Sequence, residues 1–93
     1  METLQDMRKS IDNIDNAIVA MFAERFKLTD RVGRYKAANR LPAMDASRET
    51  QQYERITELA EQYGLDPEFA RSCLAAEIAR VVRNHDRIAA QGS

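Results

Sequence analysis

The 93-residue sequence has few residues that interrupt helices, namely three Gly and two Pro. It has no Trp. It also has one cysteine, Cys73, and one histidine, His85. One cysteine excludes a disulfide within the chain, and Cys73 with His85 is too small a set for a multi-histidine zinc site. We therefore expect no metal and no disulfide framework.

The sequence also lacks an excess of positive charge and any long apolar run. Fourteen Lys and Arg against fifteen Asp and Glu give a net charge of -1, so neither nucleic acid nor an anionic membrane is an expected partner. The longest apolar run, 17–23, is far shorter than the roughly 20 residues of a membrane span, and residues 1–3 open no signal peptide. We expect one cytoplasmic domain over residues 1–93.

Helical periodicity extends over most of the chain and predicts an all-α fold with helices at about 4–39, 46–63 and 67–89. The first segment has a seam spaced by alternating steps of three and four residues, which is apolar or aromatic at every position except Arg25. The seam comprises Leu4, Met7, Ile11, Ile14, Ile18, Met21, Arg25, Leu28, Val32 and Tyr35. Thr3 and Asp6 resemble a capping box at its start.

The second and third segments have their own end signals. Asp45 or Ser47 could cap the second helix, and Gly64 is a C-terminal stop. Asp66 as N-cap, followed by Pro67 at the first helical position, predicts the start of the third helix.

A first helix over 4–39 would be about 54 Å long. A compact chain of this length has a radius of gyration of roughly 12 Å and a diameter of some 30 Å. Part of the seam would then lack a cover within its own chain, which favours an intertwined antiparallel homodimer. The alternative is a break near Gly33 and a four-helix monomer.

Three cations of the first helix are candidate ligand-binding residues. Arg25 interrupts the seam and needs an anion, either an acid of a neighbouring helix or an anionic ligand gripped by two hydrogen bonds. Lys36 lies eleven residues further, at almost the same azimuth and about 16 Å along the axis. Arg8 precedes Arg25 by about 25 Å, so it could join the cluster only from the second chain of an antiparallel dimer.

A second polar group, Asp45, Arg48 and Glu49, surrounds the start of the second helix. It is either a solvated, favourably capped turn or part of a binding site. His85, beside Asn84, is either a surface partner of the helix C-terminus or a functional side chain. The sequence has no phosphate-binding glycine loop and no nucleophile elbow, so a site for a small polyanion is the function best suited to these residues.

These residues lie in motifs that resemble the all-helical, AroQ-type chorismate mutases across essentially the whole chain. The motifs are Met7-Arg8-Lys9-Ser10-Ile11, Ile14-Asp15, Ala23-Glu24-Arg25, Val32-Gly33-Arg34-Tyr35-Lys36, Asp45-Ala46-Ser47-Arg48-Glu49 and Gly64-Leu65-Asp66. The resemblance implies an intertwined dimer of three-helix protomers with shared active sites. It also implies a cofactor-free isomerase of the shikimate pathway and aromatic amino acid biosynthesis, which rearranges chorismate to prephenate.

By this resemblance, Arg8 of the partner chain and Arg25 would bind the two carboxylates of the substrate. Lys36 would reach a carboxylate and the ether oxygen of the breaking bond. Asp45 and Glu49 would lie near the ring hydroxyl. Arg48 would complete the electrostatic frame. Catalysis would come from preorganisation, without a covalent intermediate.

Two positions depart from the family pattern. His85 stands where the family commonly has a glutamine that donates to the ether oxygen, and Val81 stands at a serine position. We expect His85, or Asn84 if the register shifts by one, to replace the amide donor. An imidazolium would donate from both nitrogens, so this role predicts that activity rises towards acidic pH.

Three other functions stay open from the sequence. Two are enzymes on the same fold: an isochorismate-pyruvate lyase, disfavoured by Glu49, and an amino-deoxychorismate mutase. The third is a helical dimerisation module without activity, in which Arg8 and Arg25 form structural ion pairs.

Overall fold

The computed structural model describes residues 1–91, which form three α-helices. They are α1 (Leu4–Ala38), α2 (Ala46–Tyr63) and α3 (Pro67–Gln91), and residues 1–91 include no strand. The predicted all-α class with a long first helix is confirmed. Because α1 continues unbroken past Gly33, the alternative of a four-helix monomer folded back at this glycine is wrong.

Local hydrogen bonds define the helix ends. The Thr3 hydroxyl accepts from the Asp6 amide at 3.1 Å and the Asp6 carboxylate accepts from the Thr3 amide at 3.0 Å, a complete capping box. Asp45, rather than Ser47, caps α2 by accepting from the Arg48 amide. Gly64 ends α2 with φ of 72°, a left-handed conformation that favours glycine.

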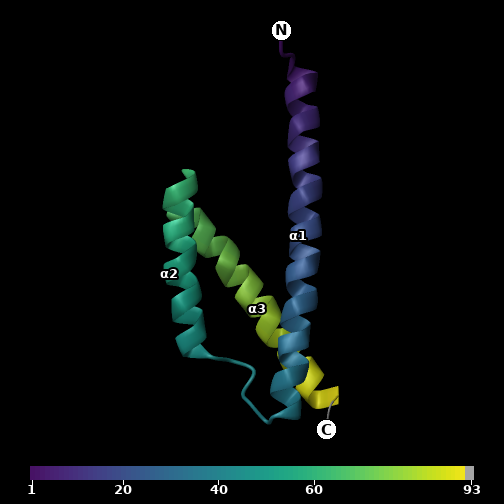
Figure 1. The fold of residues 1–93 in the computed structure, drawn as a ribbon, viewed down its shortest axis with the longest axis vertical. Helices are drawn as coiled ribbons and strands as arrows, with labels where there is room; N and C mark the ends of the chain where they lie inside the picture. Colours follow the sequence, from purple (N-terminus) through teal and green to yellow (C-terminus); the bar gives the residue numbers. More distant parts are fainter. Residues whose placement is uncertain (92–93) are drawn as a thin grey trace.

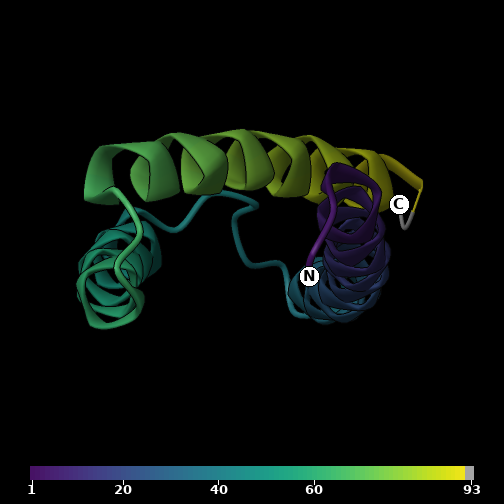
Figure 2. The ribbon, with the colours of Figure 1, turned by 90° about the horizontal axis from the view of Figure 1, so that it is seen from above.

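Helix α3 joins the other two helices. It packs against α1 near its C-terminal end and against α2 near its start, and within residues 1–91 α1 and α2 do not contact each other. Figure 2 shows α1 and α2 nearly end-on. Helix α3 lies along one side of both, with α2 near one end of α3 and α1 near the other. The site-forming residues of α1 and α2 are therefore held at a fixed separation by α3.

The N-terminal part of α1 projects beyond the other two helices (Figure 1). The chain measures 60 × 25 × 14 Å, and its radius of gyration is 16.8 Å, well above the roughly 12 Å of a compact chain of this length. Every apolar or aromatic residue of the predicted α1 seam is exposed, from Leu4 at 59% to Tyr35 at 64%. Among the described helices, none has the length and apolar composition that a membrane span requires.

Candidate active site

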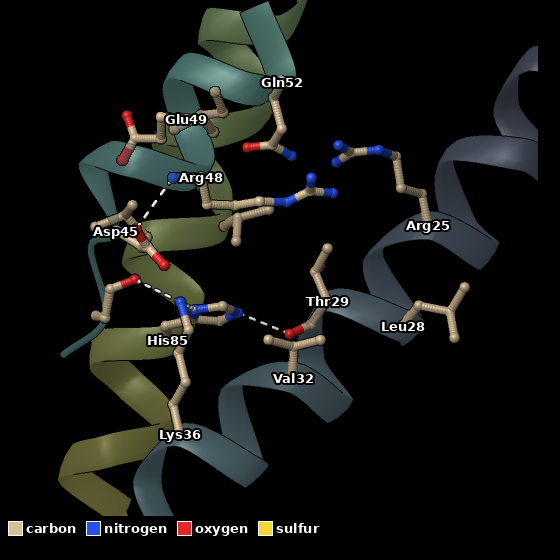
Figure 3. Close-up of a pocket in the computed structure, with 14 residues that line it drawn as sticks. Arg25, Leu28, Thr29, Val32, Lys36, Asp45, Arg48, Glu49, Gln52 and His85 are labelled. Atoms are coloured by element: carbon tan, nitrogen blue, oxygen red, sulfur yellow. Dashed lines mark hydrogen bonds between the residues drawn. The ribbon is translucent and has the colours of Figure 1, made fainter. Parts of the chain in front are cut away.

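A cavity of about 290 Å³ lies between the three helices, near the C-terminal half of α1. All three helices and the α1–α2 loop line it, so it depends on the packing of α3 against both neighbours. Its polar lining residues are Arg25, Thr29, Lys36, Asp45, Arg48, Glu49, Gln52 and His85, and its apolar ones are Leu28, Val32, Ala43, Ile78, Val81 and Val82 (Figure 3). The volume suits a small molecule.

The structure brings together all but one of the site residues predicted from the sequence. Arg25 and Lys36 from α1, Asp45, Arg48 and Glu49 from the start of α2, and Val81 and His85 from α3 line this cavity. Arg8 does not line it, because it lies on the projecting part of α1. Asn84, the alternative to His85, is buried but does not line the cavity either.

The anion that Arg25 requires is present within the chain. Its Nη1 lies 3.2 Å from Oε1 of Glu77 on α3, and the Glu77 side chain is only 15% exposed. A guanidinium has five N–H donors, so this single contact leaves the others for a ligand in the cavity that Arg25 also lines. Arg25 therefore has both a structural ion pair and a position in the pocket.

The first two turns of α2 contribute polar residues to the cavity lining, of which Arg48 and Gln52 point into the cavity (Figure 3). One carboxylate oxygen of Asp45 caps the helix by accepting from the Arg48 amide at 3.1 Å. The side chains of Arg25, Arg48 and Gln52 converge across the cavity in Figure 3. Sequence reasoning missed Gln52, although its position four residues after Arg48 places it on the same helix face.

Lys36 and His85 meet below Asp45 in the view of Figure 3. The Lys36 ammonium donates to the Ala43 carbonyl at 3.1 Å and lies 3.5 Å from Nδ1 of His85. Nε2 of His85 lies 2.7 Å from the carbonyl oxygen of Thr29. His85 is 4% exposed, so its interpretation as a surface partner of the helix C-terminus is wrong.

The His85 contacts also bear on its expected role as a donor. A carbonyl oxygen only accepts, so the ring places its N–H on Nε2 towards Thr29. Nδ1, which faces the Lys36 ammonium, is then an acceptor. In this arrangement the neutral ring has no N–H left for a substrate.

Nothing in the cavity lining points to a bound metal. Within residues 1–91, no group of three or more His, Cys, Asp or Glu side chains is arranged to hold a metal ion. The polar groups of the cavity are instead three cations, two carboxylates, an amide, a hydroxyl and an imidazole. This set can bind anionic and hydroxyl groups of an organic ligand and can place positive charge near a developing negative one.

Comparison with known proteins identifies the family. Residues 7–87, which include all the cavity-lining residues, match the family model described as chorismate mutase type II. The chain belongs to this family. Its similarity to the AroQ-type mutases, inferred from the sequence motifs, is thereby confirmed.

Individual relatives of this chorismate mutase family member differ in length. It is 42% identical over 65 residues to the bifunctional chorismate mutase/prephenate dehydratase of Aquifex aeolicus, a match covering 69% of this chain but 18% of that protein. It is 38% identical over 66 residues to the chorismate mutase of Methanocaldococcus jannaschii, covering 71% and 67%. It is 28% identical over 91 residues to the 4-amino-4-deoxychorismate mutase of Streptomyces pristinaespiralis, covering 98% and 70%. The match thus spans under a fifth of the bifunctional enzyme.

Proposed function

We propose that this chain is a cytoplasmic chorismate mutase, which catalyses the Claisen rearrangement of chorismate to prephenate. The observation that carries the proposal is the family match over residues 7–87 together with a cavity in which the family's cationic motif residues meet. In this reaction an ether C–O bond breaks while a C–C bond forms within one molecule. It needs no nucleophile, proton transfer, cofactor or metal.

The cavity supplies what such a reaction requires. Arg25 would bind one substrate carboxylate with the guanidinium donors that Glu77 leaves free. Lys36 would place its ammonium against a carboxylate and the ether oxygen, where negative charge develops as the C–O bond breaks. Arg48 would complete the positive frame. The reactive conformer would thus be held and its transition state stabilised more than its ground state.

The remaining groups would select and orient the ring. Asp45 and Glu49, at the start of α2, would lie near the ring hydroxyl. Val81 replaces the serine common in the family and contributes an apolar wall instead of a hydroxyl. Gln52 adds an amide beside Arg48 that can donate to a substrate oxygen.

We propose further that the functional unit is an intertwined homodimer. The exposed apolar seam of α1 has the spacing of a helix–helix interface, and its N-terminal part lies where α1 projects beyond α3. A second copy running antiparallel would cover this seam and bring Arg8 of each chain towards the cavity of the other. Arg8 would then bind the second carboxylate of the substrate.

Product identification tests the activity. Purified protein is incubated separately with chorismate, isochorismate and 4-amino-4-deoxychorismate, and products are separated by chromatography and identified by mass. Prephenate from chorismate is the expected result. Pyruvate released from isochorismate, or turnover of the amino analogue alone, would assign the chain to a different reaction on the same fold.

A second measurement separates an enzyme from a helical dimerisation module. Lys36→Ala removes a cation that has no acidic partner in the described chain, so we expect loss of turnover with a dimer that still folds. A dicarboxylate substrate analogue should raise the melting temperature of the wild type more than that of this variant. Equal stabilisation of both, with no turnover by either, would favour the module.

A further inference from the structure

His85 is buried against α1 with both ring nitrogens close to polar atoms of that helix. Nε2 lies 2.7 Å from the Thr29 carbonyl oxygen, and Nδ1 lies 3.5 Å from Nζ of Lys36. The carbonyl only accepts and the ammonium only donates. One state of the ring satisfies both contacts: neutral imidazole with its proton on Nε2.

Gly33 gives the imidazole room to reach the backbone of α1. A Cβ at this position would lie 2.6 Å from Cδ2 of His85 and 3.2 Å from its Nε2. Any other residue would therefore push the ring away from Thr29, one helical turn before Gly33. The glycine and the histidine form a matched pair across the α1–α3 interface.

This packing also restrains the ammonium of Lys36. Its ammonium has three N–H donors, of which one is directed to Ala43 and one to Nδ1 of His85. These two contacts restrain the direction of the third N–H of the tetrahedral ammonium. Because Lys36 also lines the cavity, this donor remains for a bound ligand.

We propose that His85 is a positioning residue, whose neutral imidazole accepts from Lys36 and aims the third N–H of the ammonium at the substrate. The inference rests on the proposed function, because the group to be aimed is the one placed against the ether oxygen. His85 itself does not touch the substrate in this role. It replaces the direct donor that the sequence alone suggested.

The proposal reverses the expected pH dependence. Protonation of the imidazole would place an N–H on Nδ1 against the Lys36 ammonium. The contact between Lys36 and Nδ1 would then be lost, and kcat would fall towards acidic pH. The charged groups that line the same cavity are Lys36 and Arg25 on α1 and Asp45, Arg48 and Glu49 on α2. A His85→Gln variant separates the effect of His85 from that of the other charged groups. Its amide has both a donor and an acceptor and does not protonate between acidic and neutral pH.

The first test needs no substrate. Nitrogen NMR of the protein labelled with ¹⁵N-histidine, at neutral pH, should show the neutral Nε2–H tautomer. The opposite tautomer, or a protonated ring at neutral pH, would overturn the proposal. This readout is independent of turnover, so its failure is distinguishable from a wild type that makes no prephenate.

Kinetics of variants provide the second test. His85→Ala should lower kcat by about 10- to 100-fold, with a smaller change in KM, because misplacing one catalytic group by about 1 Å can cost two orders of magnitude. His85→Gln should restore most of kcat and lose the decline of activity in acid. Gly33→Ala should lower kcat in the same way, because it displaces the ring without altering His85.

Asp86→Ala is the matched control, because Asp86 is the exposed neighbour of His85 on α3 and should leave kcat unchanged. Folding of each variant is verified by circular dichroism and thermal unfolding. A His85→Ala enzyme with kcat within about twofold of the wild type contradicts the proposal. So does a wild-type activity that rises in acid, which direct donation by an imidazolium would produce. If His85→Ala does not fold, the ring tautomer and the pH profile of the wild type still decide.

Discussion

Glu77 contacts Arg25 from α3 and gives the cavity a charge that opposes its proposed ligand. The two side chains are 3.2 Å apart and partly or largely buried. As an acceptor Glu77 holds the guanidinium in place, whereas as an anion it weakens the attraction of Arg25 for a substrate carboxylate. These two effects are separable because glutamine keeps the acceptor and removes the charge.

We therefore expect Glu77→Gln to lower the KM for chorismate by about two- to fivefold, with little change in kcat. This change in KM corresponds to about 0.4 to 1 kcal/mol, the order expected for one charge near a partly solvated site. Initial-rate kinetics at low ionic strength, repeated at high salt, would measure it. The control is Glu77→Ala, which also loses the acceptor and should not share the gain. A KM for Glu77→Gln equal to or above that of the wild type would contradict this electrostatic role.

At this scale the sequence could identify the residues but not their partners. Arg25 stood out as a charge in an apolar seam, and Lys36 by its shared azimuth. Glu77 lies more than 50 residues from Arg25, and only the crossing of α1 and α3 brings them together. The His85–Thr29 contact likewise requires the close helix approach at Gly33, which periodicity alone does not predict.

The capping box at the start of α1 shows how a local motif sets the properties of a whole element. The pKa of Asp6 is held below its ordinary value, chiefly by the hydrogen bond from the Thr3 amide and also by the Thr3 side chain. A carboxyl with a depressed folded-state pKa stabilises the fold above its unfolded-state pKa, and loses this contribution as pH falls through the folded-state pKa. Protonation of Asp6 should therefore loosen the first turn of α1 in acid.

Thr3→Ala removes the side-chain part of this cap, and the pKa of Asp6 should rise part of the way back to its ordinary value. An NMR titration of the Asp6 side chain in both proteins measures the change. Thr50→Ala is a matched control, because its hydroxyl donates to Ala46 within α2, and it should leave the Asp6 titration unaltered. An identical Asp6 titration in Thr3→Ala and wild type would show that the hydroxyl does not lower the pKa of Asp6.

The helix ends were readable from sequence because each depends on residues within one turn. Thr3 with Asp6, Asp66 with Pro67, and Gly64 act through contacts spanning only a few positions. The sequence could not predict whether Asp45 or Ser47 caps α2, because both residue types are favourable N-caps. The path of the connecting loop decided it.

As a whole molecule, the chain buries few apolar residues and leaves the apolar seam of α1 exposed. Its buried apolar residues within 1–91 are few and small, chiefly Ala60, Ala70 and Leu74, whereas the long α1 seam faces outward. Length and periodicity alone predict this imbalance, because a helix of about 54 Å exceeds a compact domain of this size. A second copy would cover the seam and supply Arg8 to the cavity in one step.

Shared active sites make a quantitative prediction for mixed dimers. Arg8→Ala and Lys36→Ala chains, with different tags, are each expected to form dimers with little activity. When equal amounts are refolded together, half of the dimers are mixed. Each mixed dimer has one site built from an intact Lys36 and the partner's intact Arg8. The mixture should therefore recover about a quarter of wild-type activity per chain.

The mixed dimer itself, isolated through both tags, should have half the wild-type activity, and its KM should equal the wild-type value because its one active site is unaltered. Refolding each variant alone is the control for gain of activity by the procedure. If Arg8 serves the cavity of its own chain, or none, the mixture shows only the average of the two parents. In that case the dimer could still bury the α1 seam, but its active sites would not be shared.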